Sequence, residues 1–205
     1  KQGIFEEVKM TDPAGVLRIE NTSLRNLRIS ASGYLGNNTG NTAKAGDMEH
    51  LNGRASILSG DFEYNNRKLI LRGNIISGDL SDSYQISAIN KTISKNIQYP
   101  RTPVAKNALA YGIEAGYSFR LNNPGERIVP FARYEYYNSM EKTAGSMHAD
   151  KRYQRDILTF GLNYYLMSSV AIKADYSHRR IGMGDYNNEN TFGLALVYTG
   201  WFLQK

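Results

Sequence analysis

The sequence predicts an all-β fold, a transmembrane antiparallel up-and-down β-barrel. Three observations lead to this class: long segments of alternating polarity, connections that alternate between short and long, and aromatic residues near both ends of the apolar faces. The segments run roughly ten to fourteen residues each. A soluble strand has about five or six residues, whereas a tilted strand needs about nine to eleven to cross a bilayer. Strand length therefore favours a membrane barrel.

Alternation with a period of two is clearest near the C-terminal end. Phe192, Leu194, Leu196 and Tyr198 share one face of a strand, and small residues lie between them. The same alternation is present over residues 27–35, 54–64, 68–75, 109–121, 132–137, 158–166 and 170–179, which form the main parts of the other predicted strands. Val16–Glu20 indicates a ninth strand, so the chain supplies about eight to nine.

Bacterial single-chain barrels have an even number of strands. Nine strands would leave a barrel open, so we expect the chain to form part of a larger barrel and not to close one alone. The alternative is a closed eight-strand barrel with a peripheral N-terminal segment.

The connections between these segments fall into two classes. Asn65-Asn66, Asn122–Glu126 and Met167–Ser169 are short and rich in turn-forming residues. Residues 37–53, 78–107, 139–154 and 182–189 form long connections, and the two classes alternate along the chain. Outer-membrane barrels have tight periplasmic turns and longer extracellular loops. We therefore expect all the short turns to lie at one end of the sheet.

The apolar faces predict contact with lipid. We expect Leu162, Leu194 and Leu196 to face lipid between two aromatic belts, because interfacial aromatic rings flank the apolar band of membrane barrels. The predicted belt residues are Tyr64, Tyr117, Phe119, Tyr136, Tyr164, Tyr176, Tyr198 and Phe202.

The opposite faces carry charges of both signs, and the whole chain has a net charge of +6. The predicted pore-lining residues are Arg28, Lys68, Arg72, Glu114, Arg120, Arg133, Glu135, Lys173, Asp175 and Arg179. With Asp61 and Glu63 added, these faces hold seven cations and five carboxylates, which predicts a mild anion preference. Arg72 and Arg133 lie mid-strand, where the 78–107 connection could fold inward and narrow a channel. A second interpretation is that these charges only pair across strands and stiffen the wall.

Other chemistry finds little support in the sequence. Cys is absent, no basic cluster suited to nucleic acid is present, and no helix is evident that could open with a phosphate-binding loop. Ser177 and His178 point to opposite faces of one strand, so they cannot act together. Asp185, Asn187 and Glu189 alternate and could hold Ca²⁺, although a solvated polar loop is the favoured interpretation. We expect no catalytic residue, no metal and no cofactor.

Three consecutive C-terminal motifs resemble the end of the phosphate-selective porin O and P family. They are Phe160-Gly161-Leu162-Asn163-Tyr164-Tyr165-Leu166, Ile172-Lys173-Ala174-Asp175-Tyr176-Ser177 and Asn190-Thr191-Phe192-Gly193-Leu194. The resemblance implies a barrel near sixteen strands, usually a homotrimer, that passes anions or small solutes. Residues 1–205 would then be a single β-barrel domain, the C-terminal portion of a longer porin.

The expected function is passive diffusion of small solutes or ions through the outer membrane of a Gram-negative bacterium. The expected partners are outer-membrane lipid, lipopolysaccharide and small anionic solutes, without nucleic acid. A small structural or adhesive barrel without an open channel is the alternative, since about eight strands leave an interior filled by side chains. A barrel enzyme ranks third, because no nucleophile and base share a face.

Overall fold

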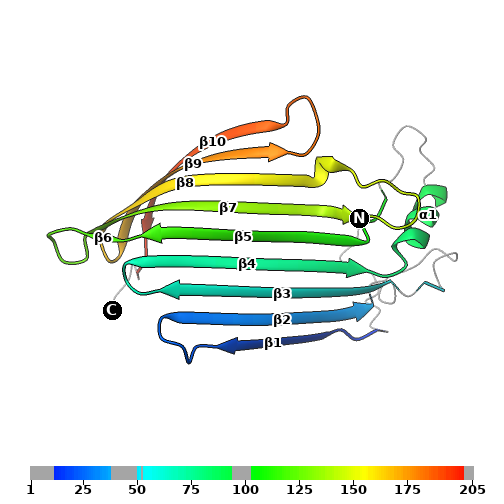
Figure 1. Cartoon of the computed structure of the whole chain (residues 1–205), viewed down its shortest axis with the longest axis horizontal. Helices are drawn as coiled ribbons and strands as arrows, with labels where there is room; N and C mark the ends of the chain where they lie inside the picture. Colours follow the sequence, from blue (N-terminus) through cyan, green and yellow to red (C-terminus); the bar gives the residue numbers. More distant parts are fainter. Residues whose placement is uncertain (1–11, 38–49, 52, 94–102, 201–205) are drawn as a thin grey trace, which may run out of the picture.

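The computed structural model describes residues 12–37, 50–51, 53–93 and 103–200. In these residues the fold is one antiparallel sheet of ten strands (Figure 1). The strands are β1 (Gly15–Asn21), β2 (Leu27–Asn37), β3 (Arg54–Asn65), β4 (Leu69–Leu80), β5 (Asn107–Tyr117), β6 (Phe119–Arg120), β7 (Arg127–Lys142), β8 (Gln154–Met167), β9 (Val170–Ile181) and β10 (Asn188–Tyr198). The predicted all-β antiparallel class is confirmed.

The strands form a meander in which each long strand pairs with the next long strand in the sequence, and the two-residue strand β6 pairs only with β7. The predicted ninth strand exists as β1. The structure has ten strands and not nine because β5 and β6 together occupy one predicted segment. β1 pairs only with β2 and β10 only with β9, so the described sheet is open. β2, which contains Leu27–Leu35, is bonded to β1 and β3, and not to β10. The eight-strand closure considered as an alternative is therefore not observed.

The connections alternate between the two ends of the sheet. The turns β1–β2, β3–β4, β6–β7 and β8–β9 lie at one end, and β2–β3, β4–β5, β7–β8 and β9–β10 join strands at the other (Figure 1). The predicted difference in length holds except between β6–β7 and β9–β10, which are each six residues long. Asn66 builds one of the short turns, because its side-chain oxygen accepts hydrogen bonds from the amides of Lys68 and Leu69 at 3.1 and 2.7 Å. β8, β9 and β10 bend away from the plane of β2–β5, so the sheet is curved.

The predicted strand 109–121 is interrupted at Ser118, which separates β5 from β6. Pro130 lies in the facing part of β7, between the partners of Gly116 and Phe119. Proline has no amide hydrogen, so it cannot donate to the ladder at this position. We attribute the interruption to Pro130.

The sequence shows no evident helix, and this expectation is wrong. The 78–107 connection contains the helix α1 (Ser83–Ile93). Its Ser87 hydroxyl donates to the carbonyl of Ser83 at 2.6 Å and accepts from the amide of Val104 at 2.8 Å. Tyr84 lies against Gly145, at the long-connection end of the sheet. A short 3-10 helix, Lys151–Tyr153, precedes β8.

The sheet is a single layer with little enclosed core. Only Ala55, Val129, Met140 and Ala171 are buried apolar residues among those described. No helix in the described part of the chain is both long and apolar enough to cross a membrane. Most large apolar side chains therefore lie on an uncovered face.

Candidate functional site

A row of alternating charges crosses five strands on one face of the sheet. Arg28, Glu63, Arg72, Glu114 and Arg133 are consecutive cross-strand partners on β2, β3, β4, β5 and β7. Paired residues of an antiparallel ladder point to the same side. We call this row the charged ladder, and the face that carries it the polar face.

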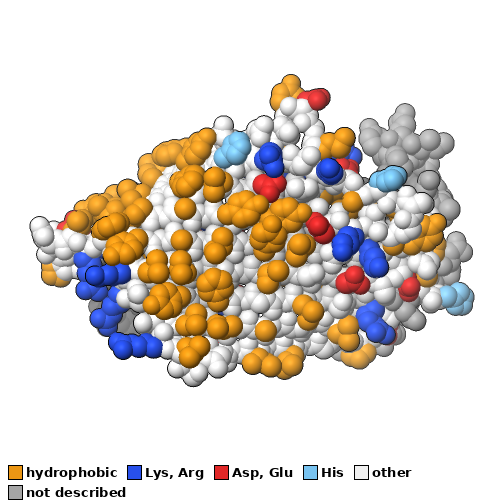
Figure 2. Space-filling view, viewed as in Figure 1, with side chains coloured by type: hydrophobic (Ala, Val, Ile, Leu, Met, Phe, Trp, Pro, Cys, Tyr) orange, Lys and Arg blue, Asp and Glu red, His pale blue; other side chains and the backbone are white. Residues whose placement is uncertain are grey.

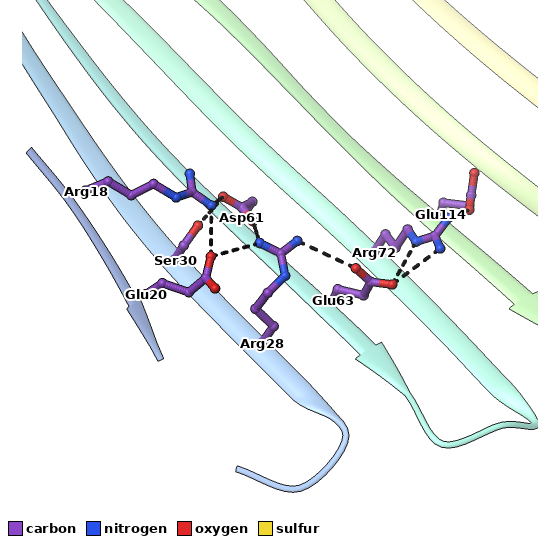
Figure 3. Close-up of polar contacts among 8 residues, drawn as sticks. All are labelled: Arg18, Glu20, Arg28, Ser30, Asp61, Glu63, Arg72 and Glu114. Atoms are coloured by element: carbon purple, nitrogen blue, oxygen red, sulfur yellow. Dashed lines mark hydrogen bonds and ion pairs between the residues drawn. The ribbon is translucent and has the colours of Figure 1, made fainter. Parts of the chain in front are cut away.

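The ladder is held by ion pairs between each cation and the carboxylates beside it (Figure 3). Arg72 lies 3.3 Å from Glu63 and 3.4 Å from Glu114, and Arg28 lies 3.6 Å from Glu63. Arg133 continues the row at 3.9 Å from Glu114, and it also lies 3.2 Å from Glu135 on its own strand. The side chains of Arg72 and Glu114 are 54% and 20% exposed, so water reaches one side of the row.

A second group of charges joins the ladder at its β1 end. Arg18 lies 3.3 Å from both Glu20 and Asp61, while Arg28 lies 3.3 Å from Glu20 and 3.1 Å from Asp61 (Figure 3). Ser30 also donates a hydrogen bond to Asp61. Arg18 and Glu20 were not among the predicted site residues, although both alternate with the apolar residues Leu17 and Ile19 in the sequence.

The ladder borders a groove of about 330 Å³. Its charged lining residues are Arg28, Asp61, Glu63, Arg72, Glu114, Arg133 and Glu135. Three cations therefore face four carboxylates, which gives this groove a formal charge of −1. Arg72 and Arg133, the two arginines predicted to select anions, are each neutralised by neighbouring carboxylates.

The groove is lined by strand residues only. The 78–107 connection was predicted to be the one most able to fold inward. Its described residues instead contact each other and the connection after β7. The described part of α1 contributes no residue to the groove.

Beyond β7 the same row continues with hydroxyl groups. Thr159, Ser177 and Thr191 are the successive partners of Arg133 on β8, β9 and β10. The hydroxyls of Thr159 and Ser177 lie 2.9 Å apart, and Thr159 is only 1% exposed. We call these three residues the hydroxyl row.

The remaining predicted pore-lining residues lie on the polar face away from the ladder. Lys68 and Arg120 are near the short turns, whereas Lys173, Asp175 and Arg179 follow one another along β9. Arg179 is ion-paired with Glu189 of β10, which the sequence had placed in a loop as a possible calcium ligand. Among the described residues, no group of three His, Asp or Glu side chains could hold a metal ion.

A turn carboxylate links the β6–β7 turn to the neighbouring strand β8 at the short-turn end. The Tyr164 hydroxyl of β8 donates to Glu126 at 2.6 Å, and the Asn123 side-chain amide donates to its other oxygen at 2.6 Å. Hydrogen bonds favour the ionised carboxylate, first from Tyr164 and then from Asn123, so the pKa of Glu126 is lowered.

The opposite face of the sheet, the apolar face, carries the residues predicted to face lipid. Leu162, Leu194 and Leu196 are 43%, 72% and 75% exposed there. Figure 2 shows apolar side chains spread across the strands of this face. The register places Tyr64, Tyr117, Phe119, Tyr136, Tyr164, Tyr176 and Tyr198 on the same face. Phe202 lies outside the described residues.

The structure thus separates the predicted polar and apolar residues onto opposite faces of one sheet. Comparison of the chain with models of protein families, with curated proteins and with solved structures finds no match. The resemblance to the porin O and P family stays a prediction.

Proposed function

We propose that the chain forms part of the wall of an outer-membrane β-barrel porin, through which small solutes and ions diffuse passively. The observation that carries the proposal is the contrast between the two faces. Phe192, Leu194 and Leu196 are exposed by 70% or more on one face, while half-exposed ion pairs occupy the other. A continuous apolar surface of this kind needs a nonaqueous partner, and lipid outside a water-lined pore supplies it.

Strand length and turn placement support the same proposal. β2, β3, β4, β7, β8, β9 and β10 contain 11 to 16 residues each. This is enough to cross a bilayer at the usual tilt, for which about nine to eleven residues are needed. By analogy with known barrels, the short turns would face the periplasm and the long connections the exterior.

The charge distribution bears on the expected anion preference. The groove beside the charged ladder has a formal charge of −1, so it does not favour anions. A mild anion preference would therefore not arise at Arg72 and Arg133. Lipopolysaccharide contact and a homotrimer stay predictions.

A structural or adhesive barrel without an open channel is the second candidate. The pairing of every ladder cation with a carboxylate favours it, because such pairs can stiffen a wall without a channel function. Single-channel conductance of the full-length protein in a planar bilayer separates the two. Stable ohmic steps support the porin, whereas inserted protein without conductance supports the structural barrel.

The contact of the apolar face with lipid is tested by a matched pair of arginine substitutions. Leu194 and Ala195 are adjacent in β10, both are exposed, and they lie on opposite faces. We expect Leu194→Arg to reduce the free energy of unfolding in lipid vesicles by about 2–4 kcal/mol near the bilayer midplane. Ala195→Arg would lie in water and should change it by less than about 1 kcal/mol. Equal effects of the two substitutions would overturn the membrane assignment.

A further inference from the structure

A second pocket lies at the short-turn end, where β6 extends beyond the β3–β4 turn. It has a volume of about 440 Å³. It is lined by Asn66, Arg67, Lys68, Tyr117, Ser118, Phe119 and Arg120. We call it the rim pocket. Figure 2 shows Lys and Arg side chains gathered at this end of the sheet, beside the apolar face.

The rim pocket exists because the strands end at different levels. β4 begins at Leu69, which is paired with Tyr117, so β6 has a partner only in β7. The amide of Ser118 donates to the carbonyl of Lys68 at 2.7 Å, and the amide of Leu121 donates to Glu126 on the opposite side. Because ladder bonds alternate in direction, the amide of Arg120 points to the same side as that of Ser118. It therefore faces the rim pocket.

The cations of the rim pocket differ from those of the charged ladder. Arg67, Lys68 and Arg120 are exposed. Within the described part of the chain none of them is within ion-pair distance of a carboxylate, whereas Arg28, Arg72 and Arg133 each contact two or more carboxylates. No acidic residue lines the rim pocket. Its local charge is positive and uncompensated, which favours an anionic ligand.

A buried hydroxyl in the wall of the pocket also lacks a partner. Ser118 is 5% exposed, and its Oγ makes no hydrogen bond to the described residues. A buried polar group without a partner is uncommon and costs stability unless a ligand or water completes it. An anionic oxygen in the rim pocket would supply the missing acceptor.

The rim pocket opens at the end of the sheet and is lined from both faces: Lys68, Ser118 and Arg120 belong to the polar face, and the aromatic rings of Tyr117 and Phe119 belong to the apolar face. Tyr117 and Phe119 have ring centroids 4.8 Å apart and are 41% and 51% exposed. Aromatic rings of this kind sit at the headgroup level of a membrane. Cations beside them attract anionic lipid headgroups. The ligand is therefore expected to combine a phosphate group with an apolar part.

We propose that the rim pocket binds the phosphate group of a phospholipid in the leaflet on the short-turn side. This inference rests on the proposed membrane function. Arg67, Lys68 and Arg120 surround the phosphate oxygens, the Ser118 hydroxyl and the Arg120 amide donate to them, and Tyr117 and Phe119 contact the start of the acyl chains.

Native mass spectrometry of the detergent-purified full-length protein tests the proposal with three probes: phosphatidylglycerol, diacylglycerol and inorganic phosphate. We expect phosphatidylglycerol to bind and diacylglycerol, which lacks the phosphate, not to bind. The variant Arg67→Gln/Lys68→Gln/Arg120→Gln should bind phosphatidylglycerol about a hundredfold more weakly, since each of the three basic residues near a lipid surface strengthens binding by about fivefold. The matched control Arg54→Gln/Arg152→Gln/Arg180→Gln removes three cations at the other end of the sheet and should bind like wild type.

Ser118→Ala gives an independent measurement. Without lipid it should leave the unfolding midpoint unchanged or slightly higher, because it removes an unsatisfied hydroxyl. It should weaken phosphatidylglycerol binding by about tenfold, the effect of losing a hydrogen bond to a charged group. A lower midpoint without lipid, together with unchanged lipid binding, would overturn the role of Ser118.

Two outcomes overturn the lipid assignment. One is equal phosphatidylglycerol binding by the rim variant and its control. The other is saturation of the pocket by inorganic phosphate with no competition from phosphatidylglycerol, which would make free phosphate the ligand. Both are separable from failure of the proposed function, because Leu194→Arg and Ala195→Arg report on the membrane face without involving the rim pocket.

Discussion

The charged ladder and the hydroxyl row occupy the same line across the sheet, yet their side chains differ in exposure to water. Arg72 in the ladder has a side chain that is 54% exposed, whereas Thr159 in the hydroxyl row is 1% exposed. Charges are tolerated where water borders them, and a buried site accepts hydroxyls that satisfy each other. The long side chains of the ladder therefore reach water at their charged ends, whereas the short side chain of Thr159 is covered by its neighbours.

Thr159→Lys is the strongest test of this difference. It would place an ammonium group at a buried site, directly opposite Arg133. We expect it to lower the free energy of unfolding by about 3–5 kcal/mol, the effect of an uncompensated buried charge. The measurement is urea unfolding in detergent micelles or lipid vesicles.

Asn74→Lys is the matched control in the ladder region. Asn74 is exposed and paired with Asp61, so the new cation would meet a carboxylate in water. The change should stay within about 1 kcal/mol. Similar losses for the two variants would show that the two parts of the row do not differ in hydration.

Thr159→Val tests the hydroxyl pair without adding charge. It keeps the shape of the side chain but removes the partner of Ser177, 2.9 Å away. The expected loss is about 1–3 kcal/mol, because a half-buried hydroxyl is left unsatisfied. Thr159→Ser retains the hydrogen bond and should lose less. If the valine variant matched wild type in urea unfolding, the hydroxyl row would have no stabilising role.

Removing a ladder cation should affect stability less and ion passage more. Arg72→Met breaks two half-exposed ion pairs, and we expect a loss of about 1 kcal/mol or less. Replacing Arg72 and Arg133 together with Glu should move the reversal potential under a salt gradient toward cations, because the groove would then hold one cation and six carboxylates.

Arg180→Glu is the control for the reversal potential. Arg180 pairs with Asp156 on the apolar face, outside the groove. The Arg180→Glu substitution should therefore leave the reversal potential unchanged. A double ladder variant with wild-type potential would remove the charged ladder from the proposed pore.

The smallest effect concerns Glu126, which connects the turn before β7 to Tyr164 of β8 and so joins the two parts of the sheet. Its pKa lies below the ordinary value of 4.5 because of the Tyr164 and Asn123 hydrogen bonds. Its stabilising contribution is therefore complete above about pH 4.5 and is lost as pH falls through the lower folded pKa. Carboxyl NMR titration should show the lowered pKa in wild type and a value nearer 4.5 in Tyr164→Phe. Glu126→Gln should abolish this part of the pH dependence of unfolding.

The sequence predicted the strands and their faces because both follow directly from a period of two. Arg28, Arg72 and Arg133 could be assigned to one face by counting alternate residues. Their ion-pair partners could not be assigned from the sequence, because the register between strands depends on turn geometry and connection length. The identity of each neighbour, and so the negative charge of the groove, required the structure.

Two features were missed although residues pointed to them. Ile86, Ile89 and Ile93 have the three- and four-residue spacing of a helix, but no acidic residue supports the first turn of α1. Pro130 is visible in the sequence, but the interruption it causes lies in the neighbouring strand at Ser118. A proline in one strand can interrupt the strand beside it, and the position of the interruption cannot be found without knowing which residues of the two strands are paired.

The meander order has a consequence for how this sheet is made. Every long strand pairs with the next long strand in the chain, so each new strand closes a contact with a segment that is near it in the sequence. Chains with such local contacts pay little loop-closure entropy and fold faster than chains with distant pairings. The sheet can therefore grow one hairpin at a time from either edge, and an edit to β10 should leave the early assembly of β1–β4 intact.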